Sequence, residues 1–453
     1  MPGCAVWATS RSMDLDPRQT HLLPLGGTGE IGMNLNAYHH AGRWLLVDCG
    51  VMFEQLDAHR SQVLFPDVSA LAGVDVAGLV ITHAHQDHLG AVRDLWPDLR
   101  CPVYCTRFAA NMLEGPLGEA GLLGRVPMRV VEEDAAFRVG PFRVRRIPLT
   151  HSTLEMGALL LETPSARVLH TGDWKLDPEP VEGRVSELGS MDALGAGGGV
   201  DQVVSDSTNA HEPGWTPSEG GLLAPLTELV AARKGRVAVT LFSSNVARVA
   251  TLARVAEATG RHLVLLGRSL QRTIKAAQDA GYLGGIVPIV SLRDYGYLPP
   301  ESVLMLCTGS QGERRAGLTR LAEDASGDLY LTAGDTVIYS ARAIPGCELA
   351  IERVRRMFAE RGVEVLTAAD GHVHVSGHPR QDELRDLYGR VRPAQVVPVH
   401  GTPMHLEAHA ELAESLDIRA ARIRNGDILR LGPRPEVVGR AVTGRRVRVE
   451  DRH

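Results

Sequence analysis

The chain has 453 residues, of which 44% are hydrophobic and 23% charged, and its formal net charge is −6 at pH 7. These values are typical of a globular protein with two or three domains, and the acidic balance excludes a globally basic nucleic-acid binder. The six cysteines form no C-x-x-C pair, which favours a reducing, cytoplasmic location. No apolar run approaches the roughly 20 residues of a membrane-spanning helix, so no membrane partner is expected.

Residues 1–20 lack an apolar segment and are expected to form a disordered tail. From residue 21 to 212 the sequence predicts short strands with glycine-rich turns and few helices, a pattern typical of sheets that carry helices on the outside. The expected strands are 21–25, 35–38, 44–47, 78–81, 128–131, 142–147, 158–162 and 168–170. We expect this segment to form the first part of one domain.

The pattern changes between residues 213 and 368. Thr216-Pro-Ser-Glu219 has the spacing of a capping box with a proline just inside the helix start, and it predicts a helix to about Arg233. The elements expected next are a strand at 237–242, a helix from Val246, a strand at 262–266, a helix from Ser269 and a strand at 303–307. This alternation predicts a parallel sheet wound with helices, and therefore a separate α/β domain.

The earlier pattern returns between residues 369 and 453. The expected elements are a strand at 372–375, a helix at 381–391, a strand at 396–399, a helix through 410, and short strands near 427–431 and 444–449. Because this segment is similar in pattern to the first one, we expect it to complete the first domain. The middle domain is therefore predicted to be an insertion.

The most informative segment is the turn after the strand at 78–81. His83, His85, Asp87 and His88 put four potential metal ligands into six residues. Imidazole and carboxylate together are the ligand set of zinc and its neighbours, whereas magnesium and calcium prefer oxygen ligands. A polar, histidine-rich turn is the alternative, but this density of ligands favours a metal site, and one that holds two metals.

Three later strand ends supply further ligands for a two-metal site. His151 follows the strand at 142–147, Asp173 follows the strand at 168–170, and His400 follows the strand at 396–399. A single histidine or aspartate at a strand end is structural more often than not. Three of them in this order, after the histidine-rich turn, favour a shared metal centre.

Several motifs in the chain resemble those of known families. T-H-A-H-Q-D-H-L-G at 82–90, H-S at 151–152, H-T-G-D at 170–173 and V-H-G at 399–401 resemble the metallo-β-lactamase superfamily. Six flanking motifs are similar to those of the β-CASP nucleases, and among these to bacterial ribonuclease J. They are L-G-G-T-G-E-I-G at 25–32, D-C-G at 48–50, S-D-S-T-N-A at 205–210, T-G-S-Q-G-E at 308–313, G-D-T-V-I at 334–338 and H-V-S-G-H at 374–378.

This resemblance implies an α/β fold, namely an αββα metallo-β-lactamase sandwich with an inserted α/β β-CASP domain. It also implies two zinc ions that share one ligand, with manganese as a competitor. The implied ligands are His83, His85 and His151 for one ion, Asp87, His88 and His400 for the other, and Asp173 for both. Two cations roughly 4 Å apart can share a hydroxide that attacks phosphorus, which leaves a 3′-hydroxyl and a 5′-phosphate.

The resemblance further implies an acid and a substrate pocket. His378 is the implied general acid for the departing 3′-oxygen, because imidazole titrates near neutral pH. Asp206 would orient that imidazole, with turn capping as its alternative role, and Asp87 completes the implied catalytic set. The implied substrate-binding residues are Ser243, Asn245, His374, Val375, Ser376, Gly377 and His378. For Ser243 and Asn245, an ordinary helix N-cap is the alternative.

The chain departs from the family pattern in three places, one of them at Ala84 and Gln86, where glycine and glutamate are more usual. The family continues S-G-H-A-S, whereas here Pro379 and Arg380 follow His378. Pro379 removes a backbone N–H, and Arg380 either adds charge to the phosphate pocket or blocks part of it. The chain is also expected to lack the C-terminal domain that bacterial relatives use in assembly, which leaves a homodimer as one open alternative. Among the remaining histidines, His39, His40, His59 and His262 are expected to be solvated or structural. His405 and His409 are spaced i, i+4 on the helix after His400 and are also expected to be structural, with a contact to the site as the alternative.

The sequence therefore predicts a zinc-dependent ribonuclease in RNA maturation and decay, with 5′→3′ exonuclease activity and endonuclease activity as a second mode. One alternative is a metallo-hydrolase of a small ester, lactam or phosphodiester. The inserted domain argues against it, because small substrates need no covering domain. The other alternative is a non-catalytic RNA-binding protein, against which the complete set of ligands argues.

Overall fold

The computed structural model describes residues 15–57, 60–324, 327, 329–344, 346–441 and 446–448. Residues 1–14 of the predicted tail, and His59, lie outside the described residues. Thr20 is buried, and its hydroxyl lies 2.7 Å from Thr163 Oγ1, so the packed chain begins before residue 21. Among the described residues, no helix has the length and apolar character needed to cross a membrane.

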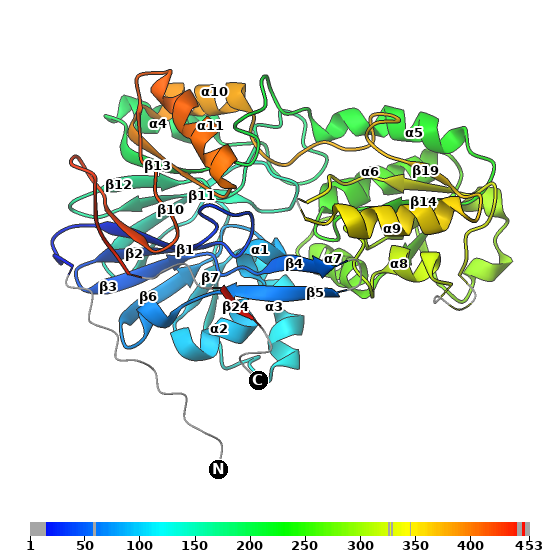
Figure 1. Cartoon of the computed structure of the whole chain (residues 1–453), viewed down its shortest axis with the longest axis horizontal. Helices are drawn as coiled ribbons and strands as arrows, with labels where there is room; N and C mark the ends of the chain where they lie inside the picture. The colour runs from blue at the N-terminus through cyan, green and yellow to red at the C-terminus, as the bar shows by residue number, and fades with distance from the viewer. Residues whose placement is uncertain are drawn as a thin grey trace, which may run out of the picture.

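Two mixed sheets face each other in the first domain (Figure 1). In spatial order, the first consists of β23 (Glu436–Arg440), β22 (Asp427–Arg430), β1 (His21–Gly26), β2 (Leu35–His40), β3 (Arg43–Val47), β6 (Asp75–Val80), β7 (Val103–Cys105) and β8 (Met128–Val130). The second consists of β21 (Arg419–Ala420), β20 (Pro393–Val399), β13 (Val200–Asp206), β12 (Arg167–His170), β11 (Gly157–Glu162), β10 (Phe142–Pro148) and β9 (Ala136–Val139). Each sheet thus contains strands that precede the inserted domain in the sequence and strands that follow it.

Alternation along the strands builds one core between the sheets and one outside each sheet. In β3, Leu45 and Val47 pack between the sheets, whereas Trp44 and Leu46 pack on the outer side. The outer helices are α2 (Val92–Leu99) and α3 (Arg107–Glu119) on the first sheet, and α4 (Leu188–Ala196), α10 (Gln381–Val391) and α11 (Pro403–Glu414) on the second. The predicted αββα sandwich is confirmed.

The inserted domain contains a six-stranded sheet in which all neighbouring strands are parallel. The strand order is β16 (Ile289–Val290), β15 (His262–Leu266), β17 (Val303–Cys307), β14 (Val237–Thr240), β18 (Thr336–Tyr339) and β19 (Glu364–Leu366). Its helices are α5 (Leu223–Ala231), α6 (Val246–Ala258), α7 (Arg268–Asp279), α8 (Gly317–Ala322) and α9 (Glu348–Ala359). The predicted inserted α/β domain is confirmed, and the boundaries at 213 and 368 stay predictions.

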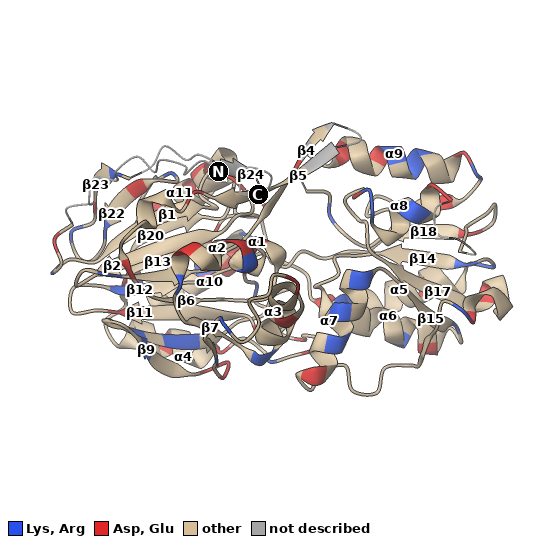
Figure 2. Ribbon diagram, turned by 90° about the horizontal axis from the view of Figure 1, so that it is seen from below, with Lys and Arg blue, Asp and Glu red and all other residues tan. Residues whose placement is uncertain are grey.

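The two domains contact each other through helices as well as through the connecting segments. Figure 2 shows α7 of the inserted domain beside α3 of the first domain. Arg272 of α7 donates a hydrogen bond to Glu119 of α3 (3.1 Å), and Asn111 donates to the Ala276 carbonyl (3.0 Å). Away from this contact, β4 (Met52–Asp57), β5 (Arg60–Pro66) and β24 (Arg446–Arg448) form a small antiparallel sheet.

Two local predictions were wrong. Residues 372–375 form no strand, because segment 371–380 runs irregularly between the domains and bonds to side chains instead of to a neighbouring strand. The predicted capping box at Thr216 is also absent. Ser218 caps the short 3-10 helix η2 (Glu219–Leu222) that precedes α5, and its side chain accepts the Gly220 N–H (3.1 Å). The Glu219 side chain instead pairs with Arg248 (2.5 Å).

Candidate active site

A buried aspartate holds the histidine-rich turn in place. The turn begins after β6 and includes the short helix α1 (Gln86–Leu89). Asp48, directly after β3, is buried and has a positive φ of 64°. Its carboxylate accepts the Thr82 backbone N–H (2.8 Å), the Thr82 hydroxyl (2.9 Å) and Nδ1–H of His88 (2.8 Å). One carboxylate therefore fixes both ends of the turn.

The other candidate ligands lie at strand ends in the second sheet. His151 follows β10, Asp173 follows β12 and His400 follows β20. Strands β12, β13 and β20 are parallel neighbours, and Asp206 at the end of β13 pairs in register with Val399. Because parallel strands end at the same edge of a sheet, their side chains converge with those of the turn.

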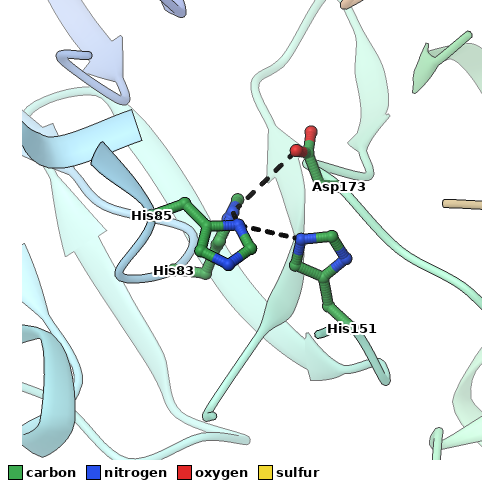
Figure 3. Close-up of side chains that lie close together, drawn as sticks. All are labelled: His83, His85, His151 and Asp173. Carbon is green, nitrogen blue, oxygen red and sulfur yellow. Dashed lines mark hydrogen bonds and ion pairs between the residues drawn. The ribbon is translucent and has the colours of Figure 1, made fainter. Parts of the chain in front are cut away.

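Three imidazoles and one carboxylate form the first group. The ligand atoms of His83, His85, His151 and Asp173 all lie within 4.8 Å of one another. His85 Nδ1 lies 3.2 Å from His83 Nε2 and 3.0 Å from His151 Nε2, and His83 Nε2 lies 3.9 Å from Asp173 Oδ2. Figure 3 shows these side chains directed toward a common point. Imidazole nitrogens that face one another so closely need a proton or a cation between them.

The second group shares Asp173 with the first. Ligand atoms of Asp87, His88, His400 and Asp173 lie within 4.8 Å of one another. Asp173 Oδ2 lies 3.1 Å from His88 Nε2 and 3.5 Å from His400 Nε2, and Asp87 Oδ2 lies 3.3 Å from His400 Nε2. Asp173 is thus common to both groups, and Asp173 and His400 also form a third group with Asp206 and His378.

Four of these imidazoles are held at Nδ1, so that Nε2 is left for a metal. Carboxylate and carbonyl oxygens only accept hydrogen bonds, so the proton on three of the rings must lie on Nδ1. The acceptors are Asp48 Oδ2 for His88 (2.8 Å), the Gly377 carbonyl for His151 (2.7 Å) and Asp206 Oδ1 for His400 (3.3 Å). His83 Nδ1 lies 2.9 Å from Thr82 Oγ1, whose own hydrogen points to Asp48.

Electrostatics divide the ligands in the same way. Although burial favours the neutral acid, His400 lowers the pKa of Asp173 to about 2. Burial and repulsion from neighbouring imidazoles lower the pKa values of His83 and His151 well below the usual range, and burial lowers that of His85 to about 4. Burial also acts against charge on His400, but Asp173 and its other carboxylate neighbours raise its pKa to about 10. The three imidazoles of the first group are therefore neutral and ready to bind a metal, and Asp173 supplies a negative charge.

One further atom indicates a cation. Asp173 Oδ1 is buried, and it has no hydrogen-bond partner among the residues that the structure describes. A buried carboxylate oxygen without a partner is costly unless a cation lies against it. Imidazole nitrogens and carboxylate oxygens suit zinc, and also manganese. The residues present therefore fit a divalent metal centre.

His378 and Asp206 form a hydrogen-bonded pair beside both groups. His378 Nδ1 donates to Asp206 Oδ2 (2.7 Å) and lies 4.0 Å from Asp173 Oδ2. Asp206 Oδ1 accepts the Thr208 backbone N–H (2.8 Å) and hydroxyl (2.7 Å). Both roles weighed for Asp206 are thus present, one on each oxygen. Burial acts against charge on His378, but Asp206 outweighs it and raises the pKa of His378.

The predicted substrate residues 374–377 lie in the irregular segment beside this pair. Ser376 Oγ accepts a hydrogen bond from Asn209 Nδ2 (2.9 Å). A Cβ at Gly377 would come within 2.8 Å of the His151 ring, so only glycine fits there. Val375 is buried in the apolar core. Burial lowers the pKa of His374 to about 3, which keeps this ring neutral.

The predicted residues of the inserted domain lie just before α6. Asn245 caps this helix, and its side-chain oxygen accepts the Arg248 N–H (2.9 Å), as the N-cap alternative predicted. Ser243 is half-buried in the same turn. The predicted structural role of His409 also agrees with the structure, since this ring is buried and bonded to Ser207 Oγ (2.8 Å). His405 stacks on His211, with 5.0 Å between the ring centroids.

Sequence reasoning assigned no role to two residues that orient the site. Asp48 is part of the motif D-C-G at 48–50 and directly follows a strand. Its position at a strand end could have predicted that it contacts the site. Asn209 stood in S-D-S-T-N-A, but its contact with segment 371–380 spans 167 residues and left no local pattern.

Comparison with known proteins identifies the family. The model for the beta-lactamase superfamily domain matches residues 43–202, the model for the ribonuclease J beta-CASP domain matches 234–357, and the model for the Zn-dependent metallo-hydrolase RNA specificity domain matches 371–422. Ribonuclease J of Sinorhizobium meliloti is 42% identical over 93% of this chain and 76% of its own length. The chain belongs to the ribonuclease J family.

Other members of the ribonuclease J family are similar over the same range. The proteins of Mycolicibacterium smegmatis and Mycobacterium tuberculosis are 38% and 37% identical, over 89% and 87% of this chain and 73% and 71% of their own lengths. A solved Enterococcus faecalis protein of unknown function shares the fold, with a TM-score of 0.64 at 16% identity over 91% of this chain and all of its own. Membership makes the chain a metal-dependent hydrolase, a nuclease of the ribonuclease J type.

Proposed function

We propose that this member of the ribonuclease J family is a zinc-dependent ribonuclease that degrades RNA from the 5′ end in RNA maturation and decay. The observation that carries the proposal is the position of Asp173. One of its oxygens faces both imidazole groups, at 3.1 Å from His88 and 3.9 Å from His83, and lies 4.0 Å from His378. A two-metal centre and an acid would therefore meet at one point, as phosphodiester hydrolysis requires.

Seven residues would hold two Zn²⁺ ions. They are His83, His85, Asp87, His88, His151, Asp173 and His400. When bound, the ions would supply a water of lowered pKa and neutralise charge on the phosphodiester. Asp87 Oδ2 lies 3.3 Å from His400 Nε2, and the other ring nitrogen of His400 lies 3.3 Å from Asp206 Oδ1. His400 therefore connects Asp87 to the acid pair.

His378 acts as the general acid. Because its Nδ1–H is committed to Asp206, the proton that can leave is the one on Nε2. Asp206 raises the pKa of His378, which favours the protonated form that a general acid needs. On cleavage the proton passes to the departing 3′-oxygen, which becomes a 3′-hydroxyl, while the other fragment keeps a 5′-phosphate.

The substrate end lies along segment 374–378 and the turn before α6. Ser243 and Ser376 offer hydroxyl groups to a phosphate, and the missing side chain of Gly377 makes room for the His151 ring beside them. Asn245 supports the turn through its capping bond. A homodimer stays a prediction.

The test compares 5′-monophosphorylated with 5′-triphosphorylated RNA, each with zinc or manganese and with chelator. Mononucleotides from the monophosphorylated RNA alone, lost with chelator, are expected for the exonuclease. Internal fragments from the triphosphorylated RNA would add the endonuclease mode. If neither RNA is cleaved but a small ester or phosphodiester is, the small-substrate alternative replaces the proposal. Binding of RNA without any metal-dependent cleavage would favour the non-catalytic alternative.

A further inference from the structure

Two arginines share one glutamate where the domains meet. Arg380 Nη2 lies 2.9 Å from Glu212 Oε2, and Arg342 Nη1 donates to Glu212 Oε1 (2.8 Å). Arg342 follows β18 in the inserted domain, whereas Glu212 follows β13 in the first domain. A guanidinium group is a cation and a carboxylate an anion, so the three side chains carry a net charge of +1.

These side chains are joined to the segment that carries the acid. Arg342 Nη1 also donates to Asn209 Oδ1 (3.0 Å). Asn209 Nδ2 in turn donates to Ser376 Oγ (2.9 Å) and to the His378 carbonyl (3.2 Å). Only one side chain therefore separates Arg342 from the segment along which the substrate end is proposed to lie.

Both arginines keep donors that the protein does not use. The Arg342 side chain is 54% exposed, and within the described part of the chain its side-chain hydrogen bonds all come from Nη1. Arg380 Nε is buried and has no hydrogen-bond partner among the described residues. A guanidinium group presents five donors in a planar fork that matches the oxygens of a phosphate.

We propose that Arg342 and Arg380 bind a phosphate group of the RNA substrate, and that Glu212 holds them in position and competes with that phosphate. The inference rests on the proposed ribonuclease function, because it names side chains that bind the same substrate. The phosphate comes either from the 5′ end or from an internal phosphodiester, since both present the same oxygens. A structural brace between the domains is the opposing explanation.

Substitution of Glu212 distinguishes the two explanations by the sign of its effect. If the three side chains are a brace, Glu212→Gln and Arg342→Gln both disturb the domain contact, and both weaken RNA binding. If they are a phosphate site, Arg342→Gln removes a donor to the phosphate, whereas Glu212→Gln removes a competing negative charge. The first change then weakens RNA binding and the second strengthens it.

The experiment measures RNA binding by fluorescence anisotropy in chelator, so that no cleavage occurs. The probes are two RNAs of one sequence, with a 5′-monophosphate or a 5′-hydroxyl. Arg342→Gln is expected to raise Kd about 10-fold and to reduce the slope of log Kd against log salt by roughly one. Arg380→Gln is expected to raise Kd by a smaller factor. Glu212→Gln is expected to lower it about 3-fold.

The matched control is Arg390→Gln, because Arg390 on α10 also pairs with two carboxylates, those of Asp192 and Asp386, but packs on α4 at the outer side of the second sheet. Its Kd should equal that of the wild type. If the arginine substitutions raise Kd for the monophosphorylated RNA alone, the bound phosphate is the 5′-terminal one. If they raise Kd equally for both RNAs, it is an internal phosphate.

An unchanged Kd in Arg342→Gln with both RNAs, or weaker binding in Glu212→Gln, would overturn the phosphate site. Cleavage by the wild-type enzyme with zinc, measured in parallel, reports on the ribonuclease proposal independently. If the wild-type enzyme cleaves RNA and the variants bind RNA with the wild-type Kd, the arginine site is refuted and the ribonuclease proposal is not. Absence of both binding and cleavage in the wild type refutes both proposals.

Discussion

The two walls of the active site are built in different ways. On the metal side, the candidate ligands stand at or just after strand ends, and His83, His88 and Asp173 are almost fully buried. On the acid side, His378 stands in the irregular segment 371–380, and its side chain is 21% exposed. Sheet hydrogen bonds fix the first wall, whereas side-chain contacts fix the second. The second wall is therefore the easier one for substitutions to alter.

Each wall rests on a buried arginine. Arg146 lies under the metal wall and donates to the carbonyls of Ile81 (3.0 Å), Thr82 (3.1 Å) and Glu155 (2.9 Å). Arg248 lies under the acid wall and donates to the carbonyls of Ser340 (2.9 Å) and Val373 (3.4 Å). The difference is that Arg248 also binds a carboxylate at close range, so its wall depends on an ion pair.

The largest effect is expected from Asp173→Asn, which tests whether the metal wall depends on one shared carboxylate. An amide is a weaker ligand and carries no charge, so zinc should fall from two ions to at most one per chain and the cleavage rate by roughly 10⁴-fold. Elemental analysis and RNA cleavage measure the two quantities. Asp192→Asn, at an exposed aspartate of α4, is the control. Full zinc content in Asp173→Asn would show that Asp173 is no ligand.

His378→Ala sharpens the comparison from the acid side. It should keep both zinc ions and lower kcat by about 10² to 10⁴-fold, because it removes the proton donor alone. Asp206→Asn should cost less, about 10 to 100-fold, since the ring stays but loses its orienting charge. Single-turnover cleavage with elemental analysis separates the two properties. Loss of zinc in His378→Ala would show that His378 is a metal ligand instead of the acid.

The metal wall could be predicted from the sequence more fully than the acid wall. The turn at 83–88 is contiguous, and the remaining candidate ligands follow apolar strands that the pattern shows directly. Segment 372–375 reads H-V-H-V and alternates like a strand, but its backbone bonds to Arg248 and Ser340 of the inserted domain. Contacts of this kind, like the pairing of Arg342 with Glu212 across 130 residues, leave no periodic signal.

Glu219→Gln tests the dependence of the acid wall on its ion pair. Glu219 binds Arg248 through two hydrogen bonds (2.5 and 3.0 Å), and both side chains are buried. Removal of the charge leaves Arg248 unpaired in the interior, at a cost of about 3–5 kcal/mol in the free energy of unfolding. Urea unfolding should show this loss, and KM for RNA should rise while zinc content stays constant.

The control for this change is Glu364→Gln, at a carboxylate that is about half exposed and pairs with Arg233 (2.7 Å). It should cost less than about 1 kcal/mol, because solvent screens such pairs. Equal losses in the two variants would contradict the special role of the buried pair. A loss of zinc in Glu219→Gln would show that the two walls are not independent.

The smallest effect concerns His409, which packs behind the metal wall. Burial lowers the pKa of His409 to about 4, whereas the unfolded chain takes up this proton near pH 6.5. Its contribution to stability is therefore present above about pH 6.5 and is lost as the pH falls toward 4, with a slope of about 1.4 kcal/mol per pH unit.

His409→Gln should reduce this slope of the unfolding free energy against pH by that amount. Urea unfolding in chelator measures it, so that metal release does not contribute. His262→Gln, at an exposed histidine, is the control for the loss of an imidazole. An unchanged slope in His409→Gln would mean that the interior behind the metal wall admits the proton, and that this wall is less rigid than its strand-end construction implies.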